Sequence, residues 1–428
     1  MIQLRPCFNF HVVLFICVPL VFAGCGGGGS ASPTGTSTVV PSVPATDSEP
    51  ISLRLSAGNG YSLFLSGDGF VWGWGRNSVG QVGNGSNADV PKPAQLPGVG
   101  GITEIAAGSL SSAALRSDGS MWVWGRNATG NLGTASSDVC VSAGGASADA
   151  CAKAPIRINE LSAVVAISSG VEYMTAVRAD GTVWGWGGLY AGGTIGNGIP
   201  VAPNTTPRQV AGLADIKSVA IGSGHALALR KDSAVFGWGY NIYGQLGTPV
   251  VGALLPQQVV GLADVSSIAA GGYQSLALKK DGRVFAWGSS VLEVARSVPR
   301  DMNVSGGVAI AAGGSHAMVL KSDGTVWAWG RNDFGQVGDG TRVDAVAPVQ
   351  VTGLAGVIAI SAGGTHSLAL TRDGSIWAWG QIDPLSVSEI DKCTFTYRDT
   401  HGTSPTGNTV VYDVPCAKRP MKVLFTGV

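Results

Sequence analysis

The chain has 428 residues, with 27 basic and 27 acidic side chains, so charged residues make up only 13% of it. A formal net charge of zero argues against a nucleic-acid-binding protein that depends on a strongly basic surface. An apolar content of 45% argues against an intrinsically disordered chain, and 65 glycines indicate many tight turns around short buried strands.

The first segment, residues 1–24, predicts an export signal. One basic residue, Arg5, precedes an apolar run over residues 12–22, an order and length typical of a secretory signal. The segment ends with the letters FAGC, which resemble a bacterial lipobox, so we expect Cys25 to carry a lipid and to begin the mature chain. A transmembrane anchor or an ordinary cleaved signal is the alternative. Residues 25–51 are rich in Gly, Ser, Thr and Pro and predict a flexible tether.

Residues 52–428 are predicted to form one domain, because a unit of roughly 50 residues recurs along them. In the clearest copy, three short apolar runs are separated by turn residues, and Asp323-Gly324 occupies a position where a hairpin needs positive φ. A Pro-x-x-Val segment, such as Pro348 to Val351, supplies a fourth strand. Seven such units predict an all-β fold, a seven-bladed β-propeller of four-stranded blades. The repeat cores span residues 53–85, 105–133, 167–198, 219–247, 268–288, 310–340 and 360–380.

The unit resembles the repeat of the regulator of chromosome condensation family. That repeat runs A-G-x-x-H-[ST]-x-x-L and then D-G-x-[VL]-[WF]-x-W-G, and residues 362–370 and 373–380 match its two parts closely. The resemblance covers residues 53–380 and implies the same propeller. The family includes a nucleotide exchange factor for a small GTPase and a secreted bacterial inhibitor of β-lactamases. The resemblance therefore makes protein binding outside the cytoplasm an expectation for this chain.

After the seventh copy, residues 391–428 depart from the repeat. Residues 393–398 and 409–416 alternate like the two strands of a hairpin, and Pro420 to Val423 repeats the Pro-x-x-Val pattern. Only the tether precedes the first copy, so we expect this last strand to pair beside the N-terminal copy and close the ring.

Four cysteines remain once the signal and Cys25 are set aside, an even number that permits three pairings. The local pairs, Cys140 with Cys151 and Cys393 with Cys416, each close a loop that departs from the repeat, and we expect them to be disulfides of an oxidising compartment. Metal ligation is the alternative, which the lack of C-x-x-C spacing disfavours.

The repeat itself offers no catalytic, metal or cofactor site. Histidine occupies one repeat position that is elsewhere Tyr, Ser or Gln, which indicates a hydrogen-bonding role; the residues are Tyr61, Ser111, Tyr173, His225, Gln274, His316 and His366. The tryptophans belong to the Trp-x-Trp-Gly positions, where packing between blades is the expected role and sugar stacking is the alternative.

The candidate binding surface lies where the blades differ. Five aromatic residues in irregular loops are candidate anchors for a protein partner: Tyr190, Tyr240, Tyr243, Tyr273 and Phe334. The alternative is that they are turn residues covered by the next blade.

These observations predict a monomeric, non-catalytic scaffold that binds an unknown protein at the cell envelope and is anchored by lipid, with no nucleic-acid partner. The glycine after Cys25 favours the outer membrane. One alternative is guanine-nucleotide exchange on a small GTPase, which needs a cytoplasmic partner. Another is an envelope polysaccharide lyase or hydrolase, which needs paired carboxylates or a His-Arg-Tyr cluster that the loops do not display.

Overall fold

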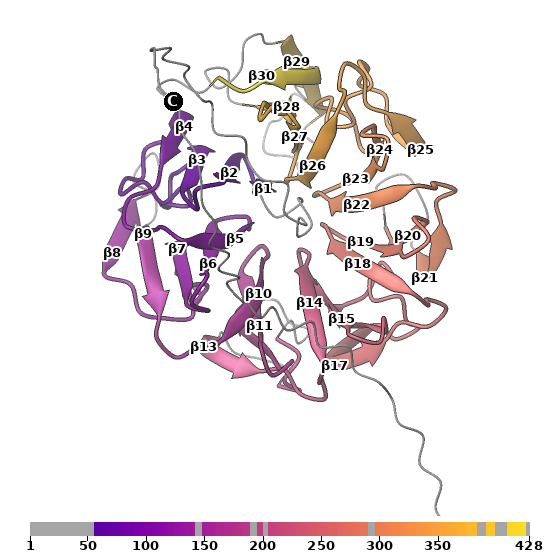
Figure 1. Cartoon of the computed structure of the whole chain (residues 1–428). Helices are drawn as coiled ribbons and strands as arrows, with labels where there is room; N and C mark the ends of the chain where they lie inside the picture. The colour runs from indigo at the N-terminus through magenta and orange to yellow at the C-terminus, as the bar shows by residue number, and fades with distance from the viewer. Residues whose placement is uncertain are drawn as a thin grey trace, which may run out of the picture. The chain divides into compact units, whose positions relative to one another are not determined.

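The computed structural model describes residues 55–141, 148–188, 195–199, 204–289, 296–382, 391–398 and 409–424. All strands in these ranges belong to seven antiparallel sheets, which follow one another around a ring (Figure 1). The fold is the all-β, seven-bladed propeller that the repeats predict. Within the described ranges, no helix has the length and apolar character needed to cross a membrane.

The blades are numbered in chain order, and the strands of each are given from the centre of the ring outwards. Blade 1 contains β1 (Leu55–Ala57), β2 (Tyr61–Leu65), β3 (Val71–Gly75) and β4 (Val90–Gln95). Blade 2 contains β5 (Ile102–Ala107), β6 (Ser111–Arg116), β7 (Met121–Arg126), β9 (Ala148–Ile158) and β8 (Asp138–Val141). Blade 3 contains β10 (Val164–Ser169), β11 (Tyr173–Arg178), β12 (Val183–Gly187) and β13 (Asn204–Gln209). Blade 4 contains β14 (Ile216–Ile221), β15 (His225–Arg230), β16 (Val235–Tyr240) and β17 (Gly252–Gln258). Blade 5 contains β18 (Val265–Ala270), β19 (Gln274–Lys279), β20 (Val284–Gly288) and β21 (Arg296–Asp301). Blade 6 contains β22 (Gly307–Ala312), β23 (His316–Lys321), β24 (Val326–Gly330) and β25 (Ala345–Gln350). Blade 7 contains β26 (Val357–Ala362), β27 (His366–Thr371), β28 (Ile376–Gln381), β30 (Thr409–Lys422) and β29 (Asp391–Arg398).

The turn between the second and third strands is built by the Asp-Gly pair of the repeat. In blade 6, Gly324 has a φ of +80°, and the Thr325 N–H donates to Asp323 Oδ1 at 2.9 Å. The aspartate thus accepts the amide that the turn leaves unpaired, while glycine supplies the left-handed conformation. In blade 4, Ser233 replaces the glycine and adopts a φ of 75°, so the blade imposes the turn even on a residue with a Cβ.

The loop after the third strand joins each regular blade to the next one. In blade 6, the Asn332 side chain accepts the Val337 N–H at 2.9 Å and holds the loop in its tight conformation. The Gln336 carbonyl then accepts two bonds from blade 7, from Trp379 Nε1 at 2.9 Å and from Ser367 Oγ at 2.9 Å. The tryptophan at the second aromatic position of every blade is buried, as the sequence predicts, and Trp124, Trp186 and Trp287 donate to the preceding blade in the same way.

The glycine of the Ala-Gly-x-x-His motif lies at the start of each turn between the first and second strands. A Cβ atom on any of these glycines would lie 2.1–2.9 Å from the carbonyl oxygen of the corresponding glycine in the next blade. No side chain fits at such a distance, so the repeat requires glycine at this position. We call these residues the glycine belt; they are Gly58, Gly108, Gly170, Gly222, Gly271, Gly313 and Gly363.

The glycine belt also shows how the ring closes, and the closing role predicted for the C-terminal strand is wrong. β30 pairs with β28, with Met421 opposite Ala378, and is therefore the fourth strand of blade 7. Blade 1 already has its own fourth strand in β4, which leaves no position for β30 beside it. The first and last blades meet instead through the belt, where the Gly364 N–H donates to the Gly58 carbonyl at 3.0 Å.

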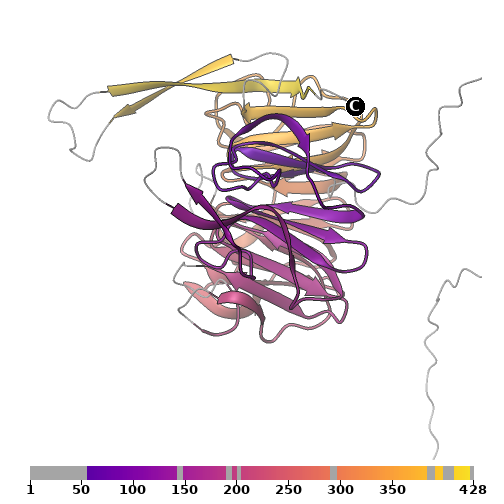
Figure 2. The ribbon, with the colours of Figure 1, turned by 90° about the vertical axis from the view of Figure 1, so that its left-hand side faces the viewer.

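Blades 2 and 7 each carry a fifth strand at the outer edge. In blade 2, Asp138 of β8 lies opposite Cys151 of β9, and in blade 7, Asp391 of β29 lies opposite Cys416 of β30. The two hairpins therefore share one register. Both project beyond the blades towards the same side of the ring (Figure 2). These blades are the two neighbours of blade 1, so the hairpins flank it.

Candidate functional site

The histidines of the repeat are structural residues. His225 Nε2 lies 2.8 Å from Ser275 Oγ of the next blade, and Tyr61, at the equivalent position of blade 1, bonds a serine hydroxyl at the same distance. Burial lowers the pKa of His225 and His316 to about 3 and that of His366 to about 4. These imidazoles are therefore neutral near pH 7 and join blades by hydrogen bonds, as the variation at this position predicts.

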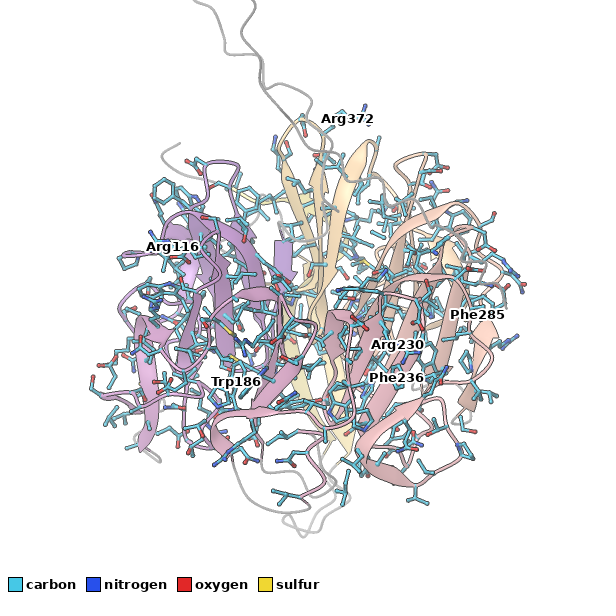
Figure 3. The ribbon with its side chains drawn as sticks, turned by 60° about the horizontal axis from the view of Figure 1, so that its bottom comes forward. Arg116, Trp186, Arg230, Phe236, Phe285 and Arg372 are labelled. Carbon is cyan, nitrogen blue, oxygen red and sulfur yellow. A yellow bond between two sulfur atoms is a disulfide. The ribbon has the colours of Figure 1, made fainter. Side chains whose placement is uncertain are left out.

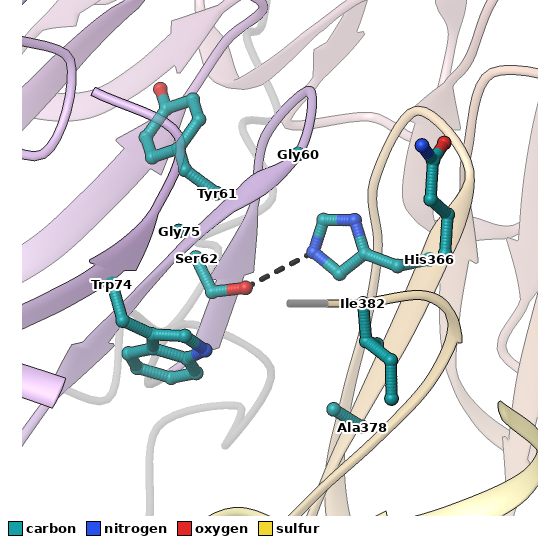
Figure 4. A pocket seen from close by; sticks show the side chains of 9 residues that line it. Gly60, Tyr61, Ser62, Trp74, Gly75, His366, Ala378 and Ile382 are labelled. Carbon is teal, nitrogen blue, oxygen red and sulfur yellow. Dashed lines mark hydrogen bonds between the residues drawn. The ribbon is translucent and has the colours of Figure 1, made fainter. Parts of the chain in front are cut away.

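A small cavity lies at the seam between blades 7 and 1 (Figure 4). Ser62 Oγ and His366 Nε2 face each other across it at 3.0 Å, and Trp74 and Ile382 complete its wall. Ile382 occupies the position that Asn332 has in blade 6, so the residue that organises the regular loop is missing at this seam. The cavity has a volume of about 20 Å³, room for roughly one water molecule, and it is too small for a substrate.

The cysteines do not form a metal site in the described part of the chain. Cys140 and Cys151 are joined by a disulfide with an S–S distance of 2.04 Å. Cys416 is also disulfide-bonded. The side chain of Cys393 and the whole of Cys25 lie outside the described residues. Across the described ranges, no group of three His, Cys, Asp or Glu side chains is arranged to hold a metal ion.

Three of the predicted aromatic anchors lie together at the seam between blades 4 and 5. The ring centroids of Tyr243 and Tyr273 are 4.7 Å apart, and those of Tyr240 and Tyr243 are 6.4 Å apart in an edge arrangement. Tyr243 is 36% exposed and Tyr273 is 45% exposed, so the next blade does not cover them. Such contacts stabilise each ring by about 0.5–1.5 kcal/mol and fix its orientation without removing it from solvent.

The loop that carries Tyr243 is held by two buried amide side chains. Asn241 Oδ1 accepts the Leu246 N–H at 2.7 Å, and Asn241 Nδ2 donates to the Thr248 carbonyl at 3.0 Å. Gln245 Oε1 accepts the N–H of Tyr243 itself at 3.0 Å. The tyrosine is thus presented on a preorganised backbone, which lowers the entropy cost of binding.

The loop that carries Tyr243 and the strand that follows it also expose aliphatic side chains. The loop between β16 and β17 exposes Ile242 by 50% and Val251 by 78%, and β17 exposes Leu255 by 45%. Residues 240–263 contain no charged side chain at all. We call the three tyrosines and the exposed aliphatic residues of the β16–β17 loop the blade 4 patch; its residues are Tyr240, Ile242, Tyr243, Val250, Val251 and Tyr273. An exposed apolar group of this kind is typical of a protein interaction site.

The opposite ends of the blades are charged. In blade 4, Arg230 pairs with Asp232 at 2.8 Å, and its guanidinium lies 5.0 Å from the centre of the Phe236 ring (Figure 3). Phe236, the first aromatic residue of the repeat's aromatic pair in blade 4, is thus half-buried under a cation. In blade 6, Lys321 lies over Trp327 in the same way, at 5.4 Å from the ring centre. These turns repeat in nearly every blade, whereas the blade 4 patch has no counterpart among the loops that the structure describes, so the patch is the more selective surface.

The remaining two predicted anchors are not in the patch. Tyr190 lies outside the described residues. Phe334 is half-buried in blade 6, at the position equivalent to Tyr243, and is flanked by the ion pair of Arg331 with Asp333. The aliphatic members of the patch are not among the predicted anchors; the signal that could have found them is the long uncharged run that follows Tyr240.

Comparison with known proteins identifies the repeat. The profile described as "RCC1-like domain" matches residues 21–293. Profiles described as "Regulator of chromosome condensation (RCC1) repeat" match residues 323–370 and 308–336.

Among curated proteins, the chain is 30% identical over 197 residues to the ultraviolet-B receptor UVR8 of Arabidopsis thaliana, covering 46% of this chain and 43% of the receptor. It is 41% identical over 95 residues to the human probable E3 ubiquitin-protein ligase HERC6, covering 22% of this chain and 9% of the ligase. The chain thus spans less than half the length of either relative.

Among solved structures, Prp20p from Saccharomyces cerevisiae matches with a TM-score of 0.66 and 23% identity, over 85% of this chain and 88% of that one. Human WBSCR16 matches with a TM-score of 0.65 and 24% identity, over 74% of this chain and 86% of that one. At this identity the likeness shows the fold.

Proposed function

Because this chain belongs to the family of proteins with an RCC1-like domain, we propose that it is a non-catalytic propeller that binds another protein at the bacterial cell envelope. The blade 4 patch is the observation that carries the proposal. Tyr243 and Tyr273 are exposed and contact each other, Asn241 and Gln245 hold the loop of Tyr243, and the same loop exposes the uncharged side chains of Ile242 and Val251. Tyrosine on a rigid scaffold is a frequent anchor of protein interfaces.

The envelope location rests on the first 51 residues and on the disulfide in the propeller. A lipobox-like FAGC sequence before a Gly-, Ser- and Pro-rich tether suits an exported lipoprotein with lipid on Cys25. The Cys140–Cys151 disulfide suits an oxidising compartment. We propose that the tether holds the propeller at the outer membrane and leaves its patch accessible.

The relatives are consistent with protein binding. The solved structure of Prp20p is described together with its binding to Gsp1p and histones, and another structure holds yeast RCC1 bound to Kap60. Nucleotide exchange is the rival function for this chain, and the predicted export signal argues against it, because export would separate the protein from a cytoplasmic GTPase. The buried, neutral repeat histidines do not provide the acid–base pair that a polysaccharide lyase or hydrolase needs.

The proposed localisation is tested by fractionation of the envelope and mass analysis of the mature N-terminus, with Cys25→Ala as the comparison. A lipidated Cys25 in the outer-membrane fraction supports the proposal. An unprocessed cytoplasmic chain contradicts it and makes nucleotide exchange the leading function.

The patch is tested by placing a photo-crosslinking amino acid at Val251 in cells that make the tethered protein. Val346 of blade 6, which is 59% exposed on β25, is the matched control position. A protein adduct at Val251 and none at Val346 supports the patch as the binding surface. Equal labelling at both positions, or none at Val251, contradicts it.

A further inference from the structure

The outer edge of β8 differs from the outer edges of the regular blades. Every fourth strand carries a proline at the equivalent position: Pro93, Pro155, Pro207, Pro256, Pro299, Pro348 and Pro420. Proline has no N–H and prevents a further strand from pairing with an edge. β8, the last strand of its sheet, spans Asp138–Val141 and contains no proline, so its edge is chemically open. β29 is likewise last in its sheet and contains no proline.

At two residues, the backbone of β8 directs outwards groups that are unpaired among the described residues. Val139 lies opposite Ala150, and the Ala150 carbonyl accepts the Asn127 N–H on the far side, away from β8. The N–H and C=O of a strand residue point to the same side, so Val139 and Ala150 do not bond to each other. The N–H and C=O of Val139 therefore face the open edge. Val141, two residues on and opposite Ala148, faces it in the same way.

The same two residues expose apolar side chains. Val139 is 55% exposed and Val141 is 50% exposed, while Cys140 between them is buried against Val79 of blade 1. The edge thus combines free backbone groups with two valines on one face. An occupant that satisfies both must be an extended strand with apolar residues at alternate positions.

The hairpin is held rigidly before any strand is added. The disulfide of Cys140 with Cys151 packs on Val79, and Asp138 Oδ2 accepts the Lys153 N–H at 2.9 Å. Asp149 pairs with Arg126 at 2.9 Å, and the same arginine pairs with Glu172 at 3.2 Å, so one cation serves two carboxylates. Asp138 and Lys153 add one charge of each sign, which leaves a net charge of −1 on these five side chains. This local charge favours an incoming strand that carries Lys or Arg next to its apolar residues.

We infer that the open edge of β8 is a strand-addition site, and that its occupant is an extended segment of a partner protein with alternating apolar and basic residues. This inference is independent of the blade 4 patch, because it rests on a different blade and on backbone groups. Either surface can fail its test without affecting the other.

The probe is an acetylated and amidated heptapeptide in which valine alternates with lysine or threonine, added to the folded and oxidised protein. We expect the amide hydrogens of Val139 and Val141 to exchange at least about tenfold more slowly when the peptide is bound, because they become hydrogen-bonded. Val139→Pro removes an N–H that does not bond to β9, and it should lower the affinity of the protein for the peptide about tenfold. Val139→Thr keeps the N–H and should lower the affinity for the peptide less. Val346→Thr in blade 6 should leave the affinity unchanged.

A peptide with N-methyl groups on the amides that face β8 should lose binding to the unmodified protein, which tests the site without any variant. The inference fails if binding leaves exchange at Val139 and Val141 unchanged, if the N-methylated peptide binds equally well, or if no binding is seen. A concentration-dependent dimer that Val139→Pro abolishes would overturn the assignment to a partner protein and identify a second copy as the occupant.

Discussion

The amide of Gly364 donates a hydrogen bond to the carbonyl of Gly58 at 3.0 Å, and this bond joins the last blade to the first. Equivalent bonds link neighbouring blades, as from Gly272 to Gly313 at 3.1 Å and from Gly314 to Gly363 at 3.0 Å. The ring is closed at its centre by backbone contacts that only glycine permits. This relationship makes the glycine belt a sensitive point for stability.

Gly363→Ala should destabilise the propeller. The new methyl group would lie 2.4 Å from the Gly58 carbonyl and 2.5 Å from the His366 ring, so the seam must open. Overpacking of this kind costs about 1–3 kcal/mol in the free energy of unfolding, measurable by chemical denaturation. Gly67→Ala is the control, because nothing lies within 4 Å of its Cβ position. Equal stability of the two variants would contradict a closing role for the belt.

His225→Gln should reduce the sensitivity of the protein to acid. The folded pKa of about 3 lies below the ordinary value of 6.5, because burial disfavours the charged ring. Between these values the unfolded chain binds a proton that the folded chain excludes, so stability falls as pH decreases from 6.5 towards 3, by up to about 1.4 kcal/mol per pH unit. Gln274 already serves at this position in blade 5, where it donates to the His316 carbonyl at 2.6 Å. Parallel stability curves for variant and wild type over this window would contradict the assignment.

Glu104→Gln should remove a pH dependence of the opposite sign. Burial raises the pKa of this half-buried carboxyl from 4.5 to about 8, against a weaker opposing effect of the Ile167 N–H at 3.4 Å. Between pH 4.5 and 8 the folded protein keeps a proton that the unfolded chain releases, so stability falls as pH rises. The variant should be more stable than wild type at pH 8, with the difference shrinking towards pH 4.5. Thermal unfolding at several pH values measures this, and a constant difference would refute it.

Truncation after residue 408 should destabilise the whole ring. It removes β30, the fourth strand of blade 7, and leaves β28 as an unpaired edge. It also removes Lys418, whose carbonyl accepts the Gly340 N–H of blade 6 at 3.0 Å. We expect a lower melting temperature with the transition still cooperative. A soluble truncated protein with an unchanged melting temperature would show that blade 7 does not need its outer strand.

Replacement of both Tyr243 and Tyr273 by Ala should abolish partner adducts at Val251 while leaving the fold intact. The two rings lie on the surface, so the loss in unfolding free energy should not exceed about 1.5 kcal/mol, the worth of their mutual contact. Phe334→Ala, in the equivalent loop of blade 6, is the matched control and should leave the adducts in place. Loss of adducts in the control alone would move the interface away from blade 4.

Local pattern determined much of this protein in advance. The repeat period predicted seven blades, Asp-Gly predicted the hairpin turns, and the Pro-x-x-Val segment predicted the fourth strand. The varied position shared by His225 and Gln274 predicted hydrogen bonding. These predictions succeed because turn geometry and strand burial depend on residues that are close together in the chain.

Contacts between distant residues were decided only by the tertiary structure. β30 pairs within blade 7, because the strand that follows each copy belongs to that copy and the tail is no exception. Tyr243 and Tyr273 meet because the β16–β17 loop of blade 4 packs beside the turn between β18 and β19 of blade 5. Ser62 and His366 face each other across 304 positions of sequence. No local pattern encodes such neighbours, since a ring brings them together only when all of its blades have packed.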